Sequence, residues 1–344
     1  MRPLVFGLLL VLVGALALWR PARVVVATFL LLPALFPSAP IDPLFRLTPE
    51  PVETQQTFEY SGGTVDTRFY APVGGGQHPA VVLLLGAGDL TRSDLAVQFA
   101  DALARLGVVV AVPESSGMLA EHLNFDEVDA IRQSIDAVRA RSDVDPSRVG
   151  IVGLSASGGL AIVAAAQPDL RDSVRFVNSF GSYDDAMTLL VDVASHSIDV
   201  EGSVRDWQPE QRTVDVVANA LVDTGVDDAT RSELLGGPSR QRATEITRNF
   251  SPEVVSRFAR ISPSSYLTQL HARLYLMHDV DDPFIPFTES RNLVASAPPG
   301  VVARYTEFSI FEHVIPERPT PWQTFVPDVW KLFWHTHALL SELL

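Results

Sequence analysis

Ser155 lies in the stretch of the chain best suited to do chemistry. It is the third residue of GLSASGG, residues 153–159, between a run rich in Val and Ile at 148–152 and an Ala-rich apolar run at 160–166. These runs predict a buried strand and a buried helix, with Ser155 in the tight turn between them. A serine at that position forms a nucleophile elbow, whose hydroxyl can attack an acyl carbon. The alternative is a turn rich in glycine and serine that has no chemical role.

Small residues surround Ser155, as an elbow requires. The backbones of the strand and the helix approach closely there, so Gly153, Ser157 and Gly159 must carry a small side chain or none. The usual motif is G-x-S-x-G, and its last position is Ser157 in this chain. Ser157 is also a rival nucleophile, although it lies beyond the apex of the turn.

Predicted strands and helices alternate along most of the chain, and this alternation would place Ser155 at the edge of a sheet. Strands are predicted at 57–60, 64–70, 80–85, 108–112, 148–152, 174–180, 273–277 and 301–308, and helices at 93–106, 125–139, 160–166, 289–297 and 327–344. The pattern predicts an α/β fold with a doubly wound, mostly parallel sheet. Ligands of such sheets bind at the carboxyl ends of the strands.

Residues 183–260 interrupt this alternation. The segment is long, charged and helical in pattern, with Trp207 and scattered Leu and Val pairs. We expect an inserted helical cap over the carboxyl ends of the strands. The alternative is a surface excursion that leads away from the site.

Two more motifs follow the elbow in the sequence. HDVDDPFIP, residues 278–286, comes after a predicted strand, and His313 is the one histidine in the loop after the last predicted strand. Together with DPSRVGIVGLS, residues 145–155, they resemble the α/β-hydrolase superfamily over residues 55–344, and within it the dienelactone-hydrolase-like and prolyl-oligopeptidase-like serine esterases. The resemblance implies an α/β-hydrolase fold and a catalytic triad in which Ser155 is the nucleophile, Asp282 the acid and His313 the base.

The acid has rivals close by. Asp281 and Asp279 lie in the same loop, where Asp279 stands in place of the usual glycine after His278, and Glu312 adjoins His313. We expect His278 to be structural and to shape the acid loop. The remaining histidines show no metal-ligand spacing, so we expect neither a metal ion nor a cofactor.

The negative charge that forms on the attacked carbonyl oxygen needs two donors. One should be the backbone N–H of Ala156, directly after the nucleophile. The other should come from the loop after the strand at 80–85, from Ala87 or Gly88. That loop reads GAGDL, residues 86–90, and lacks the histidine-plus-glycine signature of hormone-sensitive-lipase-like esterases, and Asp89 should point away from the oxyanion.

Composition excludes several classes of protein. The 344 residues are 47% hydrophobic and 19% charged, contain no cysteine, and carry a net charge of −15, although residues 1–41 hold three arginines and no acid. Disulfides, thiolate metal sites and a cysteine nucleophile are therefore ruled out. We expect no nucleic-acid partner for so acidic a body.

The N-terminus carries two uncharged apolar runs, residues 3–19 and 24–41, separated by Arg20 and Arg23. Each is near the lower limit of a membrane span, which needs roughly 17–25 residues. We expect residues 1–41 to form a membrane hairpin or anchor in contact with lipid; the alternatives are a cleaved signal peptide and another membrane-surface arrangement. Proline-rich residues 42–54 would be a linker to a hydrolase domain at 55–344. The hairpin slightly favours an extracytoplasmic domain, because arginines in its turn prefer the cytoplasm.

The combined prediction is a membrane-anchored serine hydrolase that cleaves a carboxylic ester, thioester or amide through an acyl-enzyme on Ser155. The cap and the anchor favour a small-molecule or lipid-like acyl substrate. The alternatives are an acyltransferase that uses the same triad and a non-catalytic α/β-hydrolase scaffold. The sequence leaves the substrate, the leaving group and the oligomeric state open.

Overall fold

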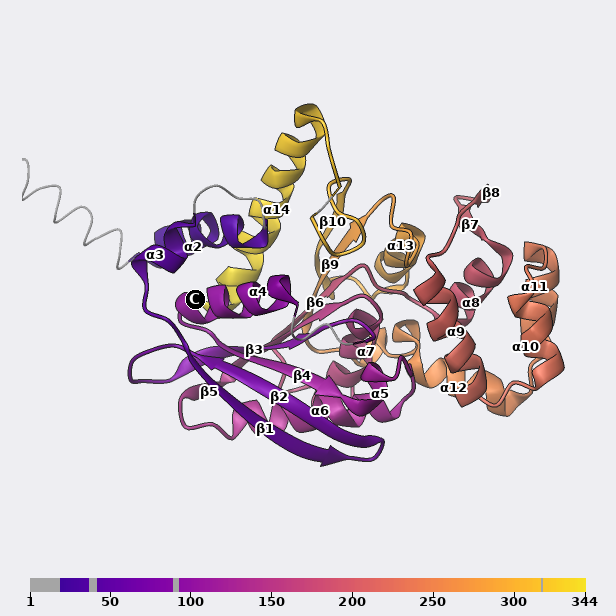
Figure 1. Cartoon of the computed structure of the whole chain (residues 1–344), viewed down its shortest axis with the longest axis horizontal. Helices are drawn as coiled ribbons and strands as arrows, with labels where there is room; N and C mark the ends of the chain where they lie inside the picture. The colour runs from indigo at the N-terminus through magenta and orange to yellow at the C-terminus, as the bar shows by residue number, and fades with distance from the viewer. Residues whose placement is uncertain (1–18, 37–41, 89–92, 317) are drawn as a thin grey trace, which may run out of the picture.

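The computed structural model of the protein describes residues 19–36, 42–88, 93–316 and 318–344. Its centre is an eight-stranded sheet in the spatial order β1-β2-β4-β3-β5-β6-β9-β10 (Figure 1). The strands are β1 (Val52–Tyr60), β2 (Gly63–Ala71), β3 (His78–Leu84), β4 (Val109–Ser115), β5 (Val144–Leu154), β6 (Phe176–Phe180), β9 (Arg273–Asp279) and β10 (Val302–Phe308). Neighbouring strands from β4 to β10 pair in parallel, and β1 and β2 join antiparallel at one edge. The predicted α/β fold with a mostly parallel sheet is confirmed.

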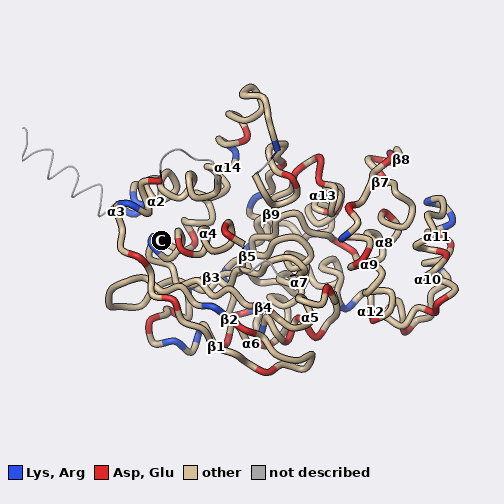
Figure 2. The backbone as a smooth tube through the Cα atoms, viewed as in Figure 1, with Lys and Arg blue, Asp and Glu red and all other residues tan. Residues whose placement is uncertain are grey.

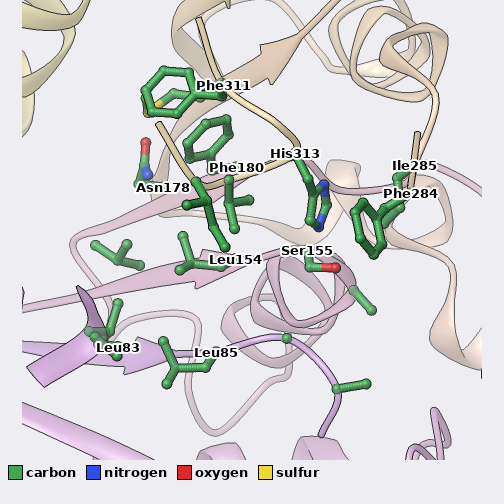
Figure 3. A pocket seen from close by; sticks show the side chains of 18 of the residues that line it. Leu83, Leu85, Leu154, Ser155, Asn178, Phe180, Phe284, Ile285, Phe311 and His313 are labelled. Atoms are coloured by element: carbon green, nitrogen blue, oxygen red, sulfur yellow. The ribbon is translucent and has the colours of Figure 1, made fainter. Parts of the chain in front are cut away.

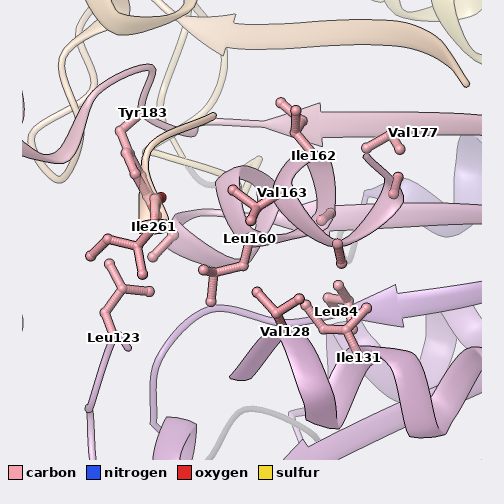
Figure 4. Close-up of a cluster of buried hydrophobic side chains, with 14 of the residues drawn as sticks. Leu84, Leu123, Val128, Ile131, Leu160, Ile162, Val163, Val177, Tyr183 and Ile261 are labelled. Carbon is pink, nitrogen blue, oxygen red and sulfur yellow. The ribbon is translucent and has the colours of Figure 1, made fainter. Parts of the chain in front are cut away.

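Helices cover both faces of this sheet because buried strands send alternate side chains to opposite faces. On β3, Val82 and Leu84 pack with α6 and α7 on one face (Figure 4), while Val81 and Leu83 pack with α2, α4 and α14 on the other. The bounds of these helices are α2 (Arg20–Leu31), α4 (Asp94–Arg105), α6 (Asp126–Arg139), α7 (Ala156–Ala165) and α14 (Trp322–Leu343). Shorter helices are α3 (Pro43–Leu47), α5 (Ser116–Leu119) and α13 (Phe287–Ser296), with 3₁₀ turns η1 (Leu32–Leu35), η2 (Pro263–Ser265) and η3 (Leu267–Gln269).

The segment between β6 and β9 forms a lobe at one end of the molecule (Figure 1). Its elements are α8 (Ala186–Ser195), β7 (Ser197–Val200), β8 (Ser203–Asp206), α9 (Gln211–Asp223), α10 (Asp228–Leu235), α11 (Arg240–Arg248) and α12 (Pro252–Ile261). The helices fit the expected insertion at 183–260, whereas the small β7–β8 hairpin was not predicted. Acidic residues are spread along the chain of this lobe and of the body of the protein (Figure 2).

The second apolar run of the N-terminus is not the second limb of a membrane hairpin. Residues 20–31 form α2, a 12-residue helix that ends in the turn η1. α2 lies against α14: Phe29 and Phe333 have ring centroids 4.7 Å apart, and Arg20 Nη2 donates to the carbonyl of Ser341 at 2.7 Å. One face of α2, with Val24, Ala27 and Leu31, is buried against the protein's own core, so the expectation of a hairpin was wrong for this run. The first run, up to residue 18, lies outside the described residues.

Every helix in the described part of the chain is too short or too polar to cross a bilayer. The expected linker at 42–54 is also partly structured. It contains the helix α3, in which Leu44 is fully buried, and β1 already begins at Val52. The terminal helix α14 begins at Trp322, five residues before its predicted start, and includes Pro327 in its first turns.

Candidate active site

Ser155 alone separates β5 from α7. Its φ of 57° and ψ of −140° are unusual for a residue with a side chain and cost about 1–3 kcal/mol. The surroundings hold it there: its N–H donates to the carbonyl of Phe180 at 2.8 Å, and a Cβ at Gly153 would lie 2.7 Å from the Cα of Gly158. The strand–turn–helix unit predicted from the sequence is present, with Ser155 at its apex.

Ser157 does not compete as a nucleophile in this arrangement. Its side chain is buried, and its hydroxyl donates to the carbonyl of Leu85 at 2.5 Å, at the end of β3. The close approach that the motif reserves for its last glycine falls one residue later, at Gly158, where a Cβ would lie 2.5 Å from Ser179 Oγ. The hydroxyl of Ser157 therefore links the elbow to the end of the neighbouring strand through a hydrogen bond.

Asp282 lies at the carboxyl end of β9, with both carboxylate oxygens held. Oδ1 accepts the backbone N–H groups of Phe284 at 2.7 Å and Ile285 at 3.0 Å, and Oδ2 lies 2.6 Å from His313 Nδ1. Burial alone would raise the pKa of Asp282, but the charge of His313 and hydrogen bonds from His278 and His313 outweigh it, so the pKa lies below its usual value. The carboxylate thus stays ionised and can hold the imidazole by its Nδ1–H.

The rival carboxylates have other partners. Asp279 is fully buried, where its Oδ2 accepts the N–H of Phe311 at 2.8 Å and its Oδ1 pairs with Arg318 at 3.0 Å. Asp281 is exposed and also pairs with Arg318. Glu312 is exposed, in a short turn closed by its backbone. Asp279 and Arg318 therefore fix the loop that carries His313, and of these four acids only Asp282 contacts the imidazole.

His278 shapes the acid loop, as expected from the sequence. Its ring is fully buried, with Nδ1 2.6 Å from Ser290 Oγ and Nε2 2.9 Å from the carbonyl of Ile285. The ring thus spans the loop from the end of β9 to α13 and holds Ile285 in the position from which its N–H reaches Asp282.

His313 follows β10 and lies over Ser155 (Figure 3). Its backbone has a φ of 59°, and its ring stacks on Phe284 with the centroids 4.8 Å apart. The residue is 7% exposed, and among the described residues Nε2 has no hydrogen-bond partner. A buried imidazole held by Nδ1 and unpaired at Nε2 is poised to accept a proton from a nearby hydroxyl.

Gly181 belongs to the site, and the sequence analysis missed it. Its φ is +63°, and a Cβ there would lie 3.0 Å from His313 Cε1 and Nδ1 and 3.3 Å from Asp282 Oδ2. The backbone of Gly181 therefore forms the wall against which the Asp–His pair packs. The signal for it was present, as a single glycine directly after the predicted strand at 174–180 and before the insertion.

Of the three expected oxyanion donors, Ala156 and Ala87 line the cavity and Gly88 is hydrogen-bonded elsewhere. Ala156 is the first residue of α7, so its N–H is one of those that a helix leaves without an intrahelical acceptor, and the residue lines the cavity described below. The N–H of Gly88 donates to the carbonyl of Met118 at 2.8 Å, so Gly88 was a wrong choice for the second donor. Ala87 lines the cavity and stays the candidate. Asp89 lies outside the described residues.

A cavity of about 600 Å³ joins these groups, with Ser155, Ala87, Phe284 and His313 in its wall. Its lining is mainly apolar, and part of it comes from α8, α9 and α12 of the insertion. The insertion thus covers the carboxyl ends of the strands. The volume of the cavity lies within the range of small-molecule sites.

Comparison with known proteins identifies the fold. No family model and no curated protein matches the sequence. Among solved structures, the 2,6-dihydroxy-pseudo-oxynicotine hydrolase matches 85% of this chain over 69% of its own, with a TM-score of 0.55 and 15% identity. The match to acylaminoacyl peptidase from Pyrococcus horikoshii covers 85% of this chain and 42% of the peptidase, with a TM-score of 0.54 and 15% identity. The match to Est1E from Butyrivibrio proteoclasticus covers 84% of this chain and 98% of Est1E, with a TM-score of 0.52 and 11% identity. The chain has the α/β-hydrolase fold.

An α/β-hydrolase fold hosts many chemistries, so the activity must be argued from the site itself. In this α/β-hydrolase-fold protein the site lies at the carboxyl ends of β3, β5, β6 and β9, where open parallel sheets bind their ligands. The described residues contain no group of three or more His, Asp and Glu side chains arranged for a metal ion.

Proposed function

We propose that this protein is a serine hydrolase that cleaves a carboxylic ester, thioester or amide through an acyl-enzyme on Ser155. The observation that supports this most strongly is the Asp282–His313 pair at 2.6 Å: the buried Nε2 of His313 has no hydrogen-bond partner in the described part of the chain and lies near Ser155 at the elbow. Ser155 and His313 line one cavity, and the buried Asp282 holds the imidazole of His313, which is the arrangement that activates a hydroxyl.

The mechanism follows from these roles. Ser155 Oγ attacks the carbonyl carbon as His313 Nε2 takes its proton, and Asp282 holds Nδ1 and stabilises the imidazolium. The N–H groups of Ala156 and Ala87 stabilise the oxyanion. Collapse of the tetrahedral intermediate expels the leaving group, which takes the proton from His313. Water, activated in the same way, then releases the acid and restores Ser155.

Labelling with a fluorophosphonate probe tests the nucleophile, with Ser155→Ala compared against Ser157→Ala. We expect Ser155→Ala to abolish labelling and Ser157→Ala to keep it. The buried hydroxyl of Ser157 is held in a hydrogen bond to the carbonyl of Leu85 and does not face the probe. The reverse pattern would move the nucleophile to Ser157. No labelling of the unaltered protein, together with no hydrolysis of ester substrates, would support a non-catalytic scaffold.

We also propose that the protein attaches to membrane lipid through its apolar residues 3–19. Support comes from the outer surface of α2 and α14, where Trp19 is 60% exposed, Phe29 58%, Trp322 72% and Trp330 56%. Tryptophan is the side chain favoured at the boundary between lipid and water. The expectation of an extracytoplasmic body rested on a membrane hairpin. Because α2 does not form the second limb of such a hairpin, this expectation has lost its basis.

Flotation with phospholipid vesicles tests this attachment. We expect the full chain to float with vesicles and a Trp322→Ser/Trp330→Ser variant to float less. Val204→Ser is the matched control, because Val204 is 61% exposed on β8 of the insertion, and it should float like the unaltered chain. Equal flotation of all three proteins would exclude the aromatic surface from binding, and no flotation of the full chain would refute the attachment.

A further inference from the structure

The cavity at Ser155 has two parts that belong to different hydrophobic clusters. One part lies beneath the insertion and is lined by residues such as Leu189, Val217 and Phe258, which belong to the cluster of α6, α7 and the cap. The other, which we call the sheet-face pocket, lies between the sheet and the helices α2, α4 and α14, which belong to a second cluster. Its walls include Leu85, Val152, Leu154, Phe99, Leu35 and Leu339.

We propose that the sheet-face pocket holds the acyl chain of the substrate, and that this chain is an unbranched hydrocarbon of medium length. The proposal rests on the function proposed above, because it needs an acyl group on Ser155. Leu154, the last residue of β5, directly precedes Ser155, and Val152 lies two residues before Leu154 on the same strand. The pocket therefore begins directly beside the nucleophile (Figure 3).

The wall of the sheet-face pocket fits a hydrocarbon. Its strands and helices contribute mainly aliphatic and aromatic side chains; Asp94 on α4 and Thr336 on α14 are polar. The one polar side chain on its strands is Asn178, and its Oδ1 already pairs with His335 Nε2 at 2.9 Å. His335 is itself fully buried, which lowers its pKa to about 3 and keeps the ring neutral. A polar group entering this pocket would lose its water and find few partners, whereas methylenes gain from burial.

The leaving group is assigned to the other part of the cavity. It departs with the proton of His313, whose ring stacks on Phe284. The carbonyl of Phe284 accepts the hydroxyl of Thr213 on α9, which places this side of the imidazole against the insertion. The part beneath the insertion therefore lies on the leaving-group side, and the acyl chain takes the opposite side.

The depth of the pocket sets the chain length. Val81 and Leu83 on β3 and Leu85 directly after it all line the pocket. The four residue steps from Val81 to Leu85 span about 13 Å at roughly 3.3 Å each, which accommodates about ten carbons in an extended chain. The far end is closed, because Val81 and Phe176 are each 1% exposed and Leu343 is 3% exposed. We therefore expect a preference for acyl chains of about 8–12 carbons, with longer chains excluded.

Fatty-acid binding tests the pocket without requiring catalysis. The probes are straight-chain fatty acids from butanoic to hexadecanoic acid, bound to full-length Ser155→Ala protein. Affinity should rise about two- to fourfold per methylene up to about ten carbons and then level off or fall.

Adding Ala96→Leu fills the pocket from α4, where Ala96 is 8% exposed, and should weaken decanoic acid at least tenfold while leaving butanoic acid unchanged. The matched control is Ala220→Leu, which fills the part beneath the insertion from α9, where Ala220 is 6% exposed, and should leave the series unchanged. Thr336→Leu, which fills the pocket from α14, replaces Ala96→Leu if that variant does not fold. Chain-length dependence that responds to Ala220→Leu and not to Ala96→Leu, or no chain-length dependence at all, would overturn the proposal.

Hydrolysis of p-nitrophenyl esters separates this proposal from the proposed function. In protein with Ser155 intact, Ala96→Leu should lower the decanoate-to-acetate ratio of kcat/KM at least tenfold. Hydrolysis that depends on Ser155 with an unchanged ratio would refute the pocket and keep the hydrolase. Chain-length-dependent binding without any hydrolysis would keep the pocket and refute the hydrolase.

Discussion

Replacing Gly181 with alanine should disable the site while changing no side chain of the proposed triad. The added Cβ would lie 3.0 Å from His313 Cε1 and Nδ1, whereas carbon atoms pack best at about 3.5–4.0 Å, so the imidazole must move by about 0.5–1 Å. The backbone cannot absorb this shift easily, because the N–H of Gly181 donates to the carbonyl of Met277 at 2.9 Å. A displacement of this size costs up to about 10²-fold in rate, so we expect a roughly 10- to 100-fold loss.

Stability should change less than activity in this variant. Alanine at a φ of +63° costs about 1–2 kcal/mol, which corresponds to a fall in Tm of about 1–3 °C for a chain of this length. Gly300→Ala is the matched control, since Gly300 has a φ of +89° and no atom within 4 Å of the position of its Cβ. It should show a similar fall in Tm and unchanged activity.

Two measurements on the same three proteins decide the result. The rate of labelling by a fluorophosphonate reports the activated serine, and thermal unfolding reports the backbone cost. If Gly181→Ala labels within twofold of Gly300→Ala at equal Tm, the close contact with His313 does not position the imidazole, and the reasoning fails.

Two further predictions concern carboxylates. Asp282→Asn should lower the rate of ester hydrolysis by roughly 10³–10⁴-fold, because an amide no longer fixes the Nδ1–H form of His313; Asp281→Asn, which changes an exposed neighbour, should stay within a few-fold, and equal losses would contradict the assignment. Asp184 is buried at the start of the insertion, and burial first, then the charge of Asp185, raises its pKa from 3.8 to about 7. Between pH 3.8 and about pH 7, Asp184 keeps its proton in the folded protein and loses it in the unfolded chain. Its contribution to the free energy of unfolding is therefore fully present below pH 3.8 and is lost as the pH rises through about 7. Asp184→Asn should therefore raise Tm relative to the unaltered protein more at pH 8 than at pH 5, and a difference independent of pH would refute the raised pKa.

The elbow and the sheet were predictable because they depend on local patterns. Short Val- and Ile-rich runs specify buried strands, and the glycines around Ser155 specify a turn that other residues cannot adopt. Parallel strands bring their carboxyl ends to one edge of the sheet, and the resemblance to the α/β-hydrolase superfamily implied that Ser155, Asp282 and His313 would meet there.

The N-terminal apolar run shows where a pattern becomes ambiguous. Burial of apolar surface is non-directional, and residues 24–35 satisfy it equally well against lipid or against a protein core. α14 supplies the partner, through contacts such as Phe29 with Phe333, and that helix lies about 300 residues further along the chain. A reading of local hydropathy contains no information about this partner.

The sequence by itself determined the α/β class of the fold and the strand–turn–helix at Ser155, because each depends on neighbouring residues; the chain order of the candidate triad followed from the resemblance to the α/β-hydrolase superfamily. Only the tertiary structure decided which acid of the loop meets the imidazole, because Asp279 and Asp282 differ in the directions of their side chains and not in type. It also decided that Gly88 is already hydrogen-bonded, that Gly181 supports His313, and that a closed apolar pocket extends from Ser155 along the sheet. These features arise where segments distant in the sequence pack together, and their geometry is set by that packing.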